Sequence, residues 1–198
     1  GKGYAGRLLD EALNLMAEHG IALSCVYGIP DLYARRGFRT CAARHSVHVR
    51  TRDLELHLHN ERVPAIFSHR LGNEADRIRI LRLYNADNRH RTGTFVRDED
   101  TWSWFGHGLG GDRLPVVRVI EDARGEIDAY AVYDTDVTDE LCVLELGCAD
   151  WQRFPLLLRL LAGEAARRRT QWIRFLTPAD HPVTHYLKYV GAESRVED

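Results

Sequence analysis

The sequence predicts an α/β (α+β) protein with a mixed central sheet flanked by helices. Two observations support this fold class. Apolar residues recur at helical spacing in two long segments, about residues 5–19 and 151–169, and short runs rich in Val, Ile and Tyr precede and follow them. The chain has 198 residues, 44% of them hydrophobic and 28% charged, which is enough for one large core or two small ones.

A first block, residues 1–50, is expected to run turn, helix, strand, helix, strand. Apolar residues recur at helical spacing in the expected first helix, and Gly20 is a stop signal; these residues are Leu8, Leu9, Ala12, Leu13 and Met16. The segment "IALSCVYG" predicts a buried strand. The segment "PDLYARRGF" predicts a short helix that opens on Pro and ends at Gly37, and "HSVHVRT" predicts a second strand.

Residues 51–62 are expected to form a connector. This stretch mixes charged residues with Leu54, Leu56 and Leu58, which occupy alternate positions. Alternation of this kind is typical of a strand with one polar face. We therefore predict an exposed connecting strand here.

A second block, residues 63–198, is expected to follow the order β, α, α, β, β, β, α, β, α. "PAIFSHRL" predicts a strand, "NEADRIRILRLYNA" a helix and "RDEDTWSWF" a short helix. Three strands follow in "PVVRVIED", "IDAYAVYDT" and "ELCVLELGC", the first two joined by a hairpin turn at "ARGE". The long helix from about residue 151 to 169, the strand "QWIRFLTP" and the helix "PVTHYLKYVG" complete the block.

Composition excludes several classes of function. A formal net charge of −2 and a pI near 6.6 give no electrostatic reason to expect nucleic acid or a membrane surface as the main partner. The 4 cysteines show no CxxC spacing, which favours reduced thiols in a cytoplasmic protein. His57 and His59 alternate along the expected connecting strand, but no third ligand is suitably spaced, so no metal is expected.

The first six residues, "GKGYAG", form a glycine-rich turn that runs directly into the first helix. Backbone N–H groups at a helix N-terminus converge on one point and carry the positive end of the helix dipole, which suits a pyrophosphate. Gly1, Gly3, Ala5 and Gly6 are small enough to let such an anion approach the backbone. An ordinary tight turn is the alternative.

This turn, followed by a strand and then by "LYARRGF", resembles the GNAT superfamily of acetyl-CoA-dependent N-acetyltransferases. In the superfamily signature, Gln or Arg is followed by two free positions, Gly, a free position, and Gly or Ala. Gly1 and Lys2 match the first two free positions, and Gly3, Tyr4 and Ala5 match the last three. The resemblance implies that Gly1, Lys2, Gly3, Tyr4, Ala5 and Gly6 bind acetyl-CoA.

The resemblance also implies a role for Tyr33. A Tyr four residues before a Gly-Phe pair lies near the CoA sulfur in the family, where it protonates the thiolate leaving group, and Tyr33, Gly37 and Phe38 reproduce that spacing. The alternative is a Tyr that packs the short helix against the sheet. No Asn stands between strand and helix, where many relatives carry one, since the stretch here is "YGIPD".

In the family four strands and two helices precede the glycine turn. The resemblance therefore implies that residues 1–50 are the C-terminal half of a catalytic GNAT domain in an N-terminally truncated fragment. Residues 63–198 then resemble a second, degenerate GNAT-like domain, as in tandem acetyltransferases of the enhanced-intracellular-survival type. In this second domain Trp151, Phe154 and Pro155 stand where small residues are needed, and Leu187 stands where a Tyr is wanted.

Two functional hypotheses follow. The first is an N-acetyltransferase that transfers an acetyl group from acetyl-CoA to a primary amine by direct attack, with a small-molecule or protein acceptor. The fragment itself is expected to be inactive. The second is a non-catalytic GNAT-like module for binding or assembly, in which homo-oligomer contacts are possible. Trp102, Trp104 and Phe105 are expected to fill a core or to line an acceptor cleft, with the core favoured.

Overall fold

The computed structural model describes residues 3–26, 30–41, 43–61, 64, 66–91, 93–106, 114–134 and 139–197. It divides into two compact units, Gly1–Ala43 and Arg44–Glu197. The two units are described separately below. No helix in the described ranges is both long enough and apolar enough to cross a membrane.

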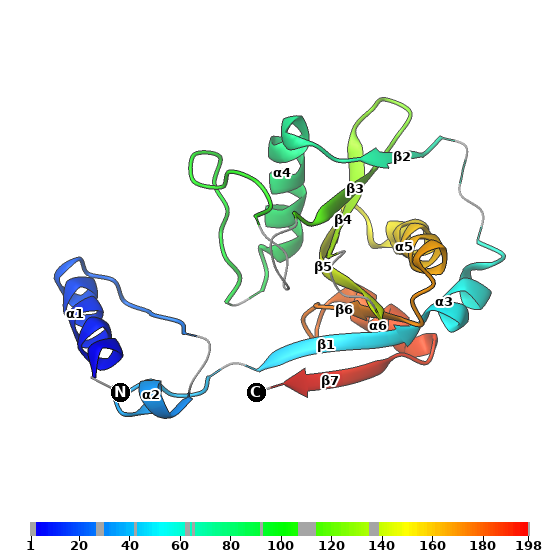
Figure 1. Cartoon of the computed structure of the whole chain (residues 1–198). Helices are drawn as coiled ribbons and strands as arrows, with labels where there is room; N and C mark the ends of the chain where they lie inside the picture. The colour runs from blue at the N-terminus through cyan, green and yellow to red at the C-terminus, as the bar shows by residue number, and fades with distance from the viewer. Residues whose placement is uncertain are drawn as a thin grey trace. The chain divides into compact units, whose positions relative to one another are not determined.

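The first unit contains two helices, α1 (Tyr4–Glu18) and α2 (Pro30–Ala34), in agreement with the prediction (Figure 1). Of the apolar residues expected on one face of α1, Leu9, Leu13 and Met16 form a half-buried stripe, whereas Leu8 and Ala12 are exposed. None of the side chains that the structure describes in this unit is fully buried. Within its own residues, this unit therefore has no hydrophobic core.

The strand predicted at "IALSCVYG" is not found. Residues 21–26 have no regular secondary structure, and the last two residues of that segment lie outside the described ranges. The side chains of Ile21 and Leu23 are 52% and 76% exposed. An apolar run forms a buried strand only where a neighbouring strand and a packed face are available, and the first unit offers neither in its described residues.

The second unit is built on one mixed sheet of seven strands, which confirms the predicted fold class (Figure 1). Its spatial order is β2-β3-β4-β5-β6-β1-β7. Strands β5 and β6 pair in parallel, and every other neighbouring pair is antiparallel. The strands are β1 (Arg44–Arg50), β2 (Ser68–Leu71), β3 (Val116–Glu121), β4 (Ile127–Asp134), β5 (Glu140–Cys148), β6 (Trp172–Phe175) and β7 (Glu193–Glu197).

Strand β1 was predicted as the end of the first block, but it lies inside the sheet of the second unit. Val47 stands opposite Phe175 of β6 on one side and Ser194 of β7 on the other. The compact unit therefore begins at Arg44 rather than near residue 63. Strand β7 was not predicted, because "ESRVE" is polar and forms a strand by pairing with the edge of β1.

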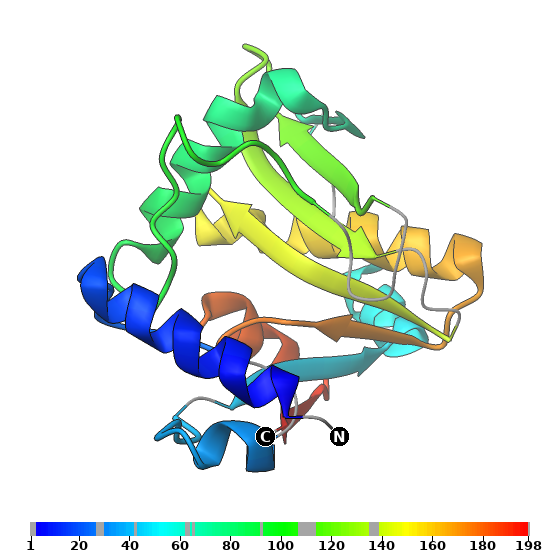
Figure 2. The same cartoon turned by 60° about the vertical axis from the view of Figure 1, so that its left-hand side comes forward.

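Helices cover both faces of this sheet, and Figure 2 shows α4 and α5 on opposite sides of it. Side chains of β3 alternate between the two cores: Val117 and Val119 join Ile80 of α4, whereas Ile120 joins Leu157 of α5. The helical elements are α3 (Thr51–Leu58), η1 (Glu74–Asp76), α4 (Arg77–Asn88), η2 (Trp151–Arg153), α5 (Phe154–Arg168) and α6 (Pro182–Tyr189).

The connector is helical, so the prediction of a strand was wrong. In α3 the side chains of Leu54 and Leu58 are buried, and Leu56 is 64% exposed. Leu54 and Leu58 are four residues apart, so they share a helical face, and that face packs against α5. Thr51 at the start of the helix donates its hydroxyl to the carbonyl of Thr170 at 2.8 Å.

The short helix predicted at "RDEDTWSWF" is a turn. Both Asp98 carboxylate oxygens are used locally: Oδ1 accepts from the amides of Asp100 and Thr101, and Oδ2 accepts from the Thr101 hydroxyl. These side-chain hydrogen bonds offer the backbone an alternative to a helix. The hairpin turn predicted at "ARGE" is confirmed, with Gly125 at φ 79°.

Candidate active site

The glycine turn lies at the N-terminus of α1. Gly3 is the N-cap residue with φ 74°, a left-handed conformation that favours glycine, and its carbonyl accepts the first helical hydrogen bond from Arg7 at 3.2 Å. By helical geometry the amides of Tyr4, Ala5 and Gly6 have no acceptor within the helix, so they are directed outward from its end. Gly1 and Lys2 lie outside the described residues.

Gly6 has a structural explanation of its own. A Cβ atom at this position would lie 2.4 Å from Nη2 of Arg36, so a larger residue would require that guanidinium to move from its place against the helix. Arg36 in turn donates from Nε to Oδ1 of Asp10 at 2.5 Å and from Nη2 to Oδ2 at 3.2 Å. This pair joins α1 to the segment that follows α2, and it fixes a cation beside the first turn of α1.

Tyr33 lies in α2, and Gly37 and Phe38 form the C-terminal cap of this helix. The amide of Phe38 donates to the Tyr33 carbonyl at 3.4 Å, and the amide of Gly37, at φ 87°, donates to the Ala34 carbonyl at 3.2 Å. This is the Schellman pattern, in which the residue after the glycine contacts the helix side chain. The rings of Tyr33 and Phe38 accordingly meet edge to face, with centroids 5.8 Å apart.

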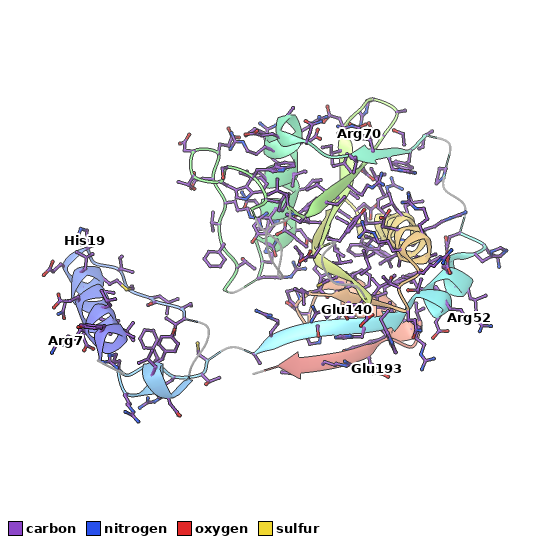
Figure 3. The ribbon with its side chains drawn as sticks, viewed as in Figure 1. Arg7, His19, Arg52, Arg70, Glu140 and Glu193 are labelled. Atoms are coloured by element: carbon purple, nitrogen blue, oxygen red, sulfur yellow. The ribbon has the colours of Figure 1, made fainter. Side chains whose placement is uncertain are left out.

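The structure therefore brings the described part of the glycine turn and the Tyr33 helix into one unit, with Arg36 as the link. Arg7 and Arg36 were not among the sequence-predicted site residues. Arg7 lies in the first turn of α1, and His19 lies just beyond its last turn, as Figure 3 shows. Arg7 adds a cationic residue to the first turn of α1, whereas the charge of Arg36 is balanced by Asp10. Their signal in the sequence was weak, because arginine is common on exposed helices.

In the second unit the helix that corresponds to α1 is α5. A carboxylate of the protein occupies the position at its start where a phosphate would bind. The carboxylate of Asp150 accepts from the amide of Gln152 at 3.0 Å at the start of η2. A negative charge therefore already occupies this helix start, and Pro155 removes one further N–H donor. Leu187 is fully buried in the core. This half of the molecule lacks the features that the glycine turn provides.

Trp102, Trp104 and Phe105 form an aromatic cluster packed on the sheet face beneath α4. The cluster surrounds Arg97, whose guanidinium carbon lies 3.7 Å from the ring centroid of Tyr84 and 4.7 Å from that of Trp102. Burial raises the pKa of the Tyr84 hydroxyl. The cluster thus fills a core and holds a loop cation.

Arg97 is also paired with Glu145 of β5. Nη1 donates to Oε1 at 2.8 Å and Nη2 to Oε2 at 2.5 Å, and the buried Tyr130 hydroxyl donates to Oε1 at 2.8 Å. Burial and the neighbouring Glu145 carboxylate raise the pKa of Tyr130 well above its ordinary value. A side chain of the protein itself therefore occupies the polar centre of this cluster.

The two histidines of the connector do not meet. The ring of His57 contacts Tyr186 edge to face, with centroids 5.7 Å apart, and His59 is the C-cap residue of α3. Within the described ranges, no group of three or more His, Cys, Asp or Glu side chains is arranged to hold a metal ion.

Comparison with known proteins gives information on the fold alone. No protein-family model matches the sequence, and no curated protein matches it. Several solved structures are similar over 100% of this chain, and three of them serve as examples. These are a probable N-acyltransferase from Enterococcus faecalis (TM-score 0.72, 16% identity), a GCN5-related N-acetyltransferase from Anabaena variabilis (0.69, 16%) and one from Kribbella flavida (0.67, 17%).

The matched part amounts to 48%, 50% and 47% of those three chains, respectively. This chain therefore spans about half the length of the solved structures that it resembles. At this level of identity the similarity shows a GNAT-like fold, which agrees with the seven-stranded mixed sheet. It is also consistent with a relation to part of a larger or tandem protein.

Proposed function

We propose that the intact protein is an N-acetyltransferase that transfers an acetyl group from acetyl-CoA to a primary amine. The observation that carries the proposal is the left-handed Gly3 at the N-terminus of α1. It leaves a helix end with outward amides, at which a Cβ atom built on Gly3 would meet no other described atom within 4 Å, and such a helix end suits a pyrophosphate. The GNAT-like fold of the chain supports the same reaction class.

In the proposed reaction the amine nitrogen attacks the acetyl carbonyl carbon directly. The carbon–sulfur bond then breaks, and the thiolate takes its proton from the Tyr33 hydroxyl. The proton lost by the acylated nitrogen passes to water, and water restores the proton of Tyr33. Catalysis arises largely from holding the two reactants together. The acceptor is a small-molecule or protein amine, and Arg7 adds positive charge to the first turn of α1, where the pyrophosphate would bind.

The proposal assigns different roles to the parts of the chain. Residues 1–43 supply the C-terminal half of a catalytic domain, and residues 44–197, which include β1 and the connector helix α3, form a non-catalytic GNAT-like domain. The carboxylate cap of Asp150 favours this last role, because it occupies the helix start at which a second pyrophosphate would bind. A non-catalytic scaffold for binding or assembly, with no catalysis in either unit, is the competing proposal.

Titration of the protein expressed from the complete reading frame with acetyl-CoA tests the proposal. We expect saturable binding by calorimetry and release of free CoA thiol when a panel of primary amines is added. Binding without thiol release from any amine would favour the scaffold. Absence of acetyl-CoA binding would contradict the proposal.

A further inference from the structure

A cleft of about 480 Å³ lies between α5 and the β2–β3 edge of the sheet, in the second unit and apart from the glycine turn. Clefts of this volume are typical of small-molecule sites. Its apolar lining comes from Phe67, Ile120, Leu156 and Leu160. Figure 1 shows the two elements that form its walls, β3 and α5.

Cationic side chains also line this cleft. Arg118 projects from β3, and Arg159 and Arg167 project from α5. Arg159 donates to the backbone carbonyl of Glu61, and no carboxylate among the described residues lies within ion-pair distance of it. Glu164 is the nearby carboxylate, but it is shared by Arg118, Arg167 and Arg168. Positive charge therefore exceeds negative charge around the cleft.

Arg118 and Arg159 contribute to the cleft in different ways. The guanidinium of Arg118 faces Glu164, with Nη2 3.8 Å from Oε2, and lies near the Tyr133 hydroxyl. Its Nε atom is buried, so a ligand in the cleft cannot reach that donor. Arg159 lines the cleft and has no carboxylate partner among the described residues. Its guanidinium can therefore donate two parallel hydrogen bonds to a planar carboxylate.

Gly163 leaves the cleft open. It lies on the α5 face that lines the cleft, and a Cβ atom built at this residue meets no other atom within 4 Å. A glycine in a helix interior is costly, and it is retained where space is needed. The cleft thus combines an apolar lining, an excess of guanidinium groups and free volume.

We propose that this cleft is a binding site for an amphipathic carboxylate, with its carboxylate on Arg159 and its aliphatic chain against Phe67, Ile120 and Leu156. The chemistry follows from the lining: an apolar chain alone would leave the Arg159 guanidinium without a charged partner, and a small inorganic anion would leave the apolar lining exposed to water. The site is independent of the proposed acetyl transfer, because every residue that forms it belongs to the second unit.

Calorimetric titration of residues 1–198 with sodium octanoate tests the proposal, with 1-octanol and sodium acetate as comparison ligands. We expect one octanoate per chain and an affinity at least about tenfold higher than for either comparison ligand. Equal affinity for octanoate and 1-octanol would overturn the ionic part of the proposal. Absence of octanoate binding would overturn it altogether.

Two variants locate the site. Gly163→Leu should fill the cleft without a clash and abolish octanoate binding, while the melting temperature stays the same or rises because leucine favours a helix. Arg159→Gln should weaken octanoate binding at least about threefold, whereas Arg82→Gln, a matched loss of an exposed arginine on α4, should not. Binding that survives Gly163→Leu unchanged would place the ligand elsewhere and refute the assignment.

Discussion

The guanidinium of Arg36 donates two hydrogen bonds to the carboxylate of Asp10, from Nε to Oδ1 at 2.5 Å and from Nη2 to Oδ2 at 3.2 Å. This contact joins the two helices of a unit in which no described side chain is fully buried. The position of Tyr33 relative to the glycine turn therefore depends on a polar contact rather than on a core.

The first prediction concerns pH. The hydrogen bond from Arg36 lowers the pKa of Asp10 below its ordinary value of 3.8. The ion pair therefore contributes in full above pH 3.8 and is lost as the pH falls through the lower, folded-state value. We expect amide protection in α1 and α2, measured by hydrogen exchange and corrected for intrinsic rates, to fall over that acidic range.

The same loss of protection should appear near neutral pH in Asp10→Asn. Glu11→Gln is the matched control, since Glu11 is an adjacent carboxylate on α1 with no ion pair among the described residues. Equal protection in Asp10→Asn and in the unmodified protein would show that the pair does not hold the helices together.

The second prediction concerns Tyr33→Phe in the complete enzyme. The substitution keeps the ring against Phe38 and removes only the hydroxyl, so the helix C-terminus should remain intact. Loss of a general acid should lower turnover by about 100-fold and leave acetyl-CoA affinity nearly unchanged. Steady-state kinetics with calorimetry measure both quantities, and unchanged turnover would remove Tyr33 from the mechanism.

The third prediction compares two glycines of the same helix. Gly3 and Gly20 flank α1 with φ 74° and 68°, and a Cβ at either position meets no atom within 4 Å. Gly3→Val and Gly20→Val should therefore impose similar backbone strain of about 1–2 kcal/mol. Only Gly3→Val should weaken acetyl-CoA binding to the intact protein, by about tenfold or more in calorimetry. Equal effects of the two variants would indicate strain rather than a binding site.

The fourth prediction concerns Arg97 and Glu145 in the second unit. Glu145→Gln leaves a half-buried guanidinium without its carboxylate, so the free energy of unfolding should fall by about 2 kcal/mol. Urea unfolding followed by tryptophan fluorescence measures this. Arg82→Gln serves as the control, because that arginine is 73% exposed and its loss should cost less than about 0.5 kcal/mol. A similar small cost for both variants would show that the aromatic cluster alone holds the loop.

The connector, residues 51–62, shows where the hydrophobic pattern of the sequence does not distinguish a strand from a helix. Leu54, Leu56 and Leu58 fit a strand by alternation, and Leu54 and Leu58 also fit a helix by their spacing of four. Local sequence did not separate these two periods. Packing against α5 favours the helix over the strand, because it buries Leu54 and Leu58 and leaves Leu56 exposed.

The candidate site likewise contains one feature that the sequence predicted and one that it did not. The spacing of Tyr33, Gly37 and Phe38 was visible in the sequence because a helix C-terminus is a local structure, closed by hydrogen bonds over five residues. The contact between Arg36 and Asp10 was not visible, because it joins residues 26 positions apart and arginine spacing carries no signal for such a pair.

The sequence by itself determined the mixed α/β class, the strands β3 to β6, the helices α1, α2 and α4 to α6, and the glycine turn, because hydrophobic period and turn residues act over a few positions. Only the tertiary structure decided that β1 lies between β6 and β7, that residues 21–26 form no strand, and that Arg36 lies against Gly6. Strand pairing and packing depend on which partners the folded chain brings together, and a local pattern does not encode those partners.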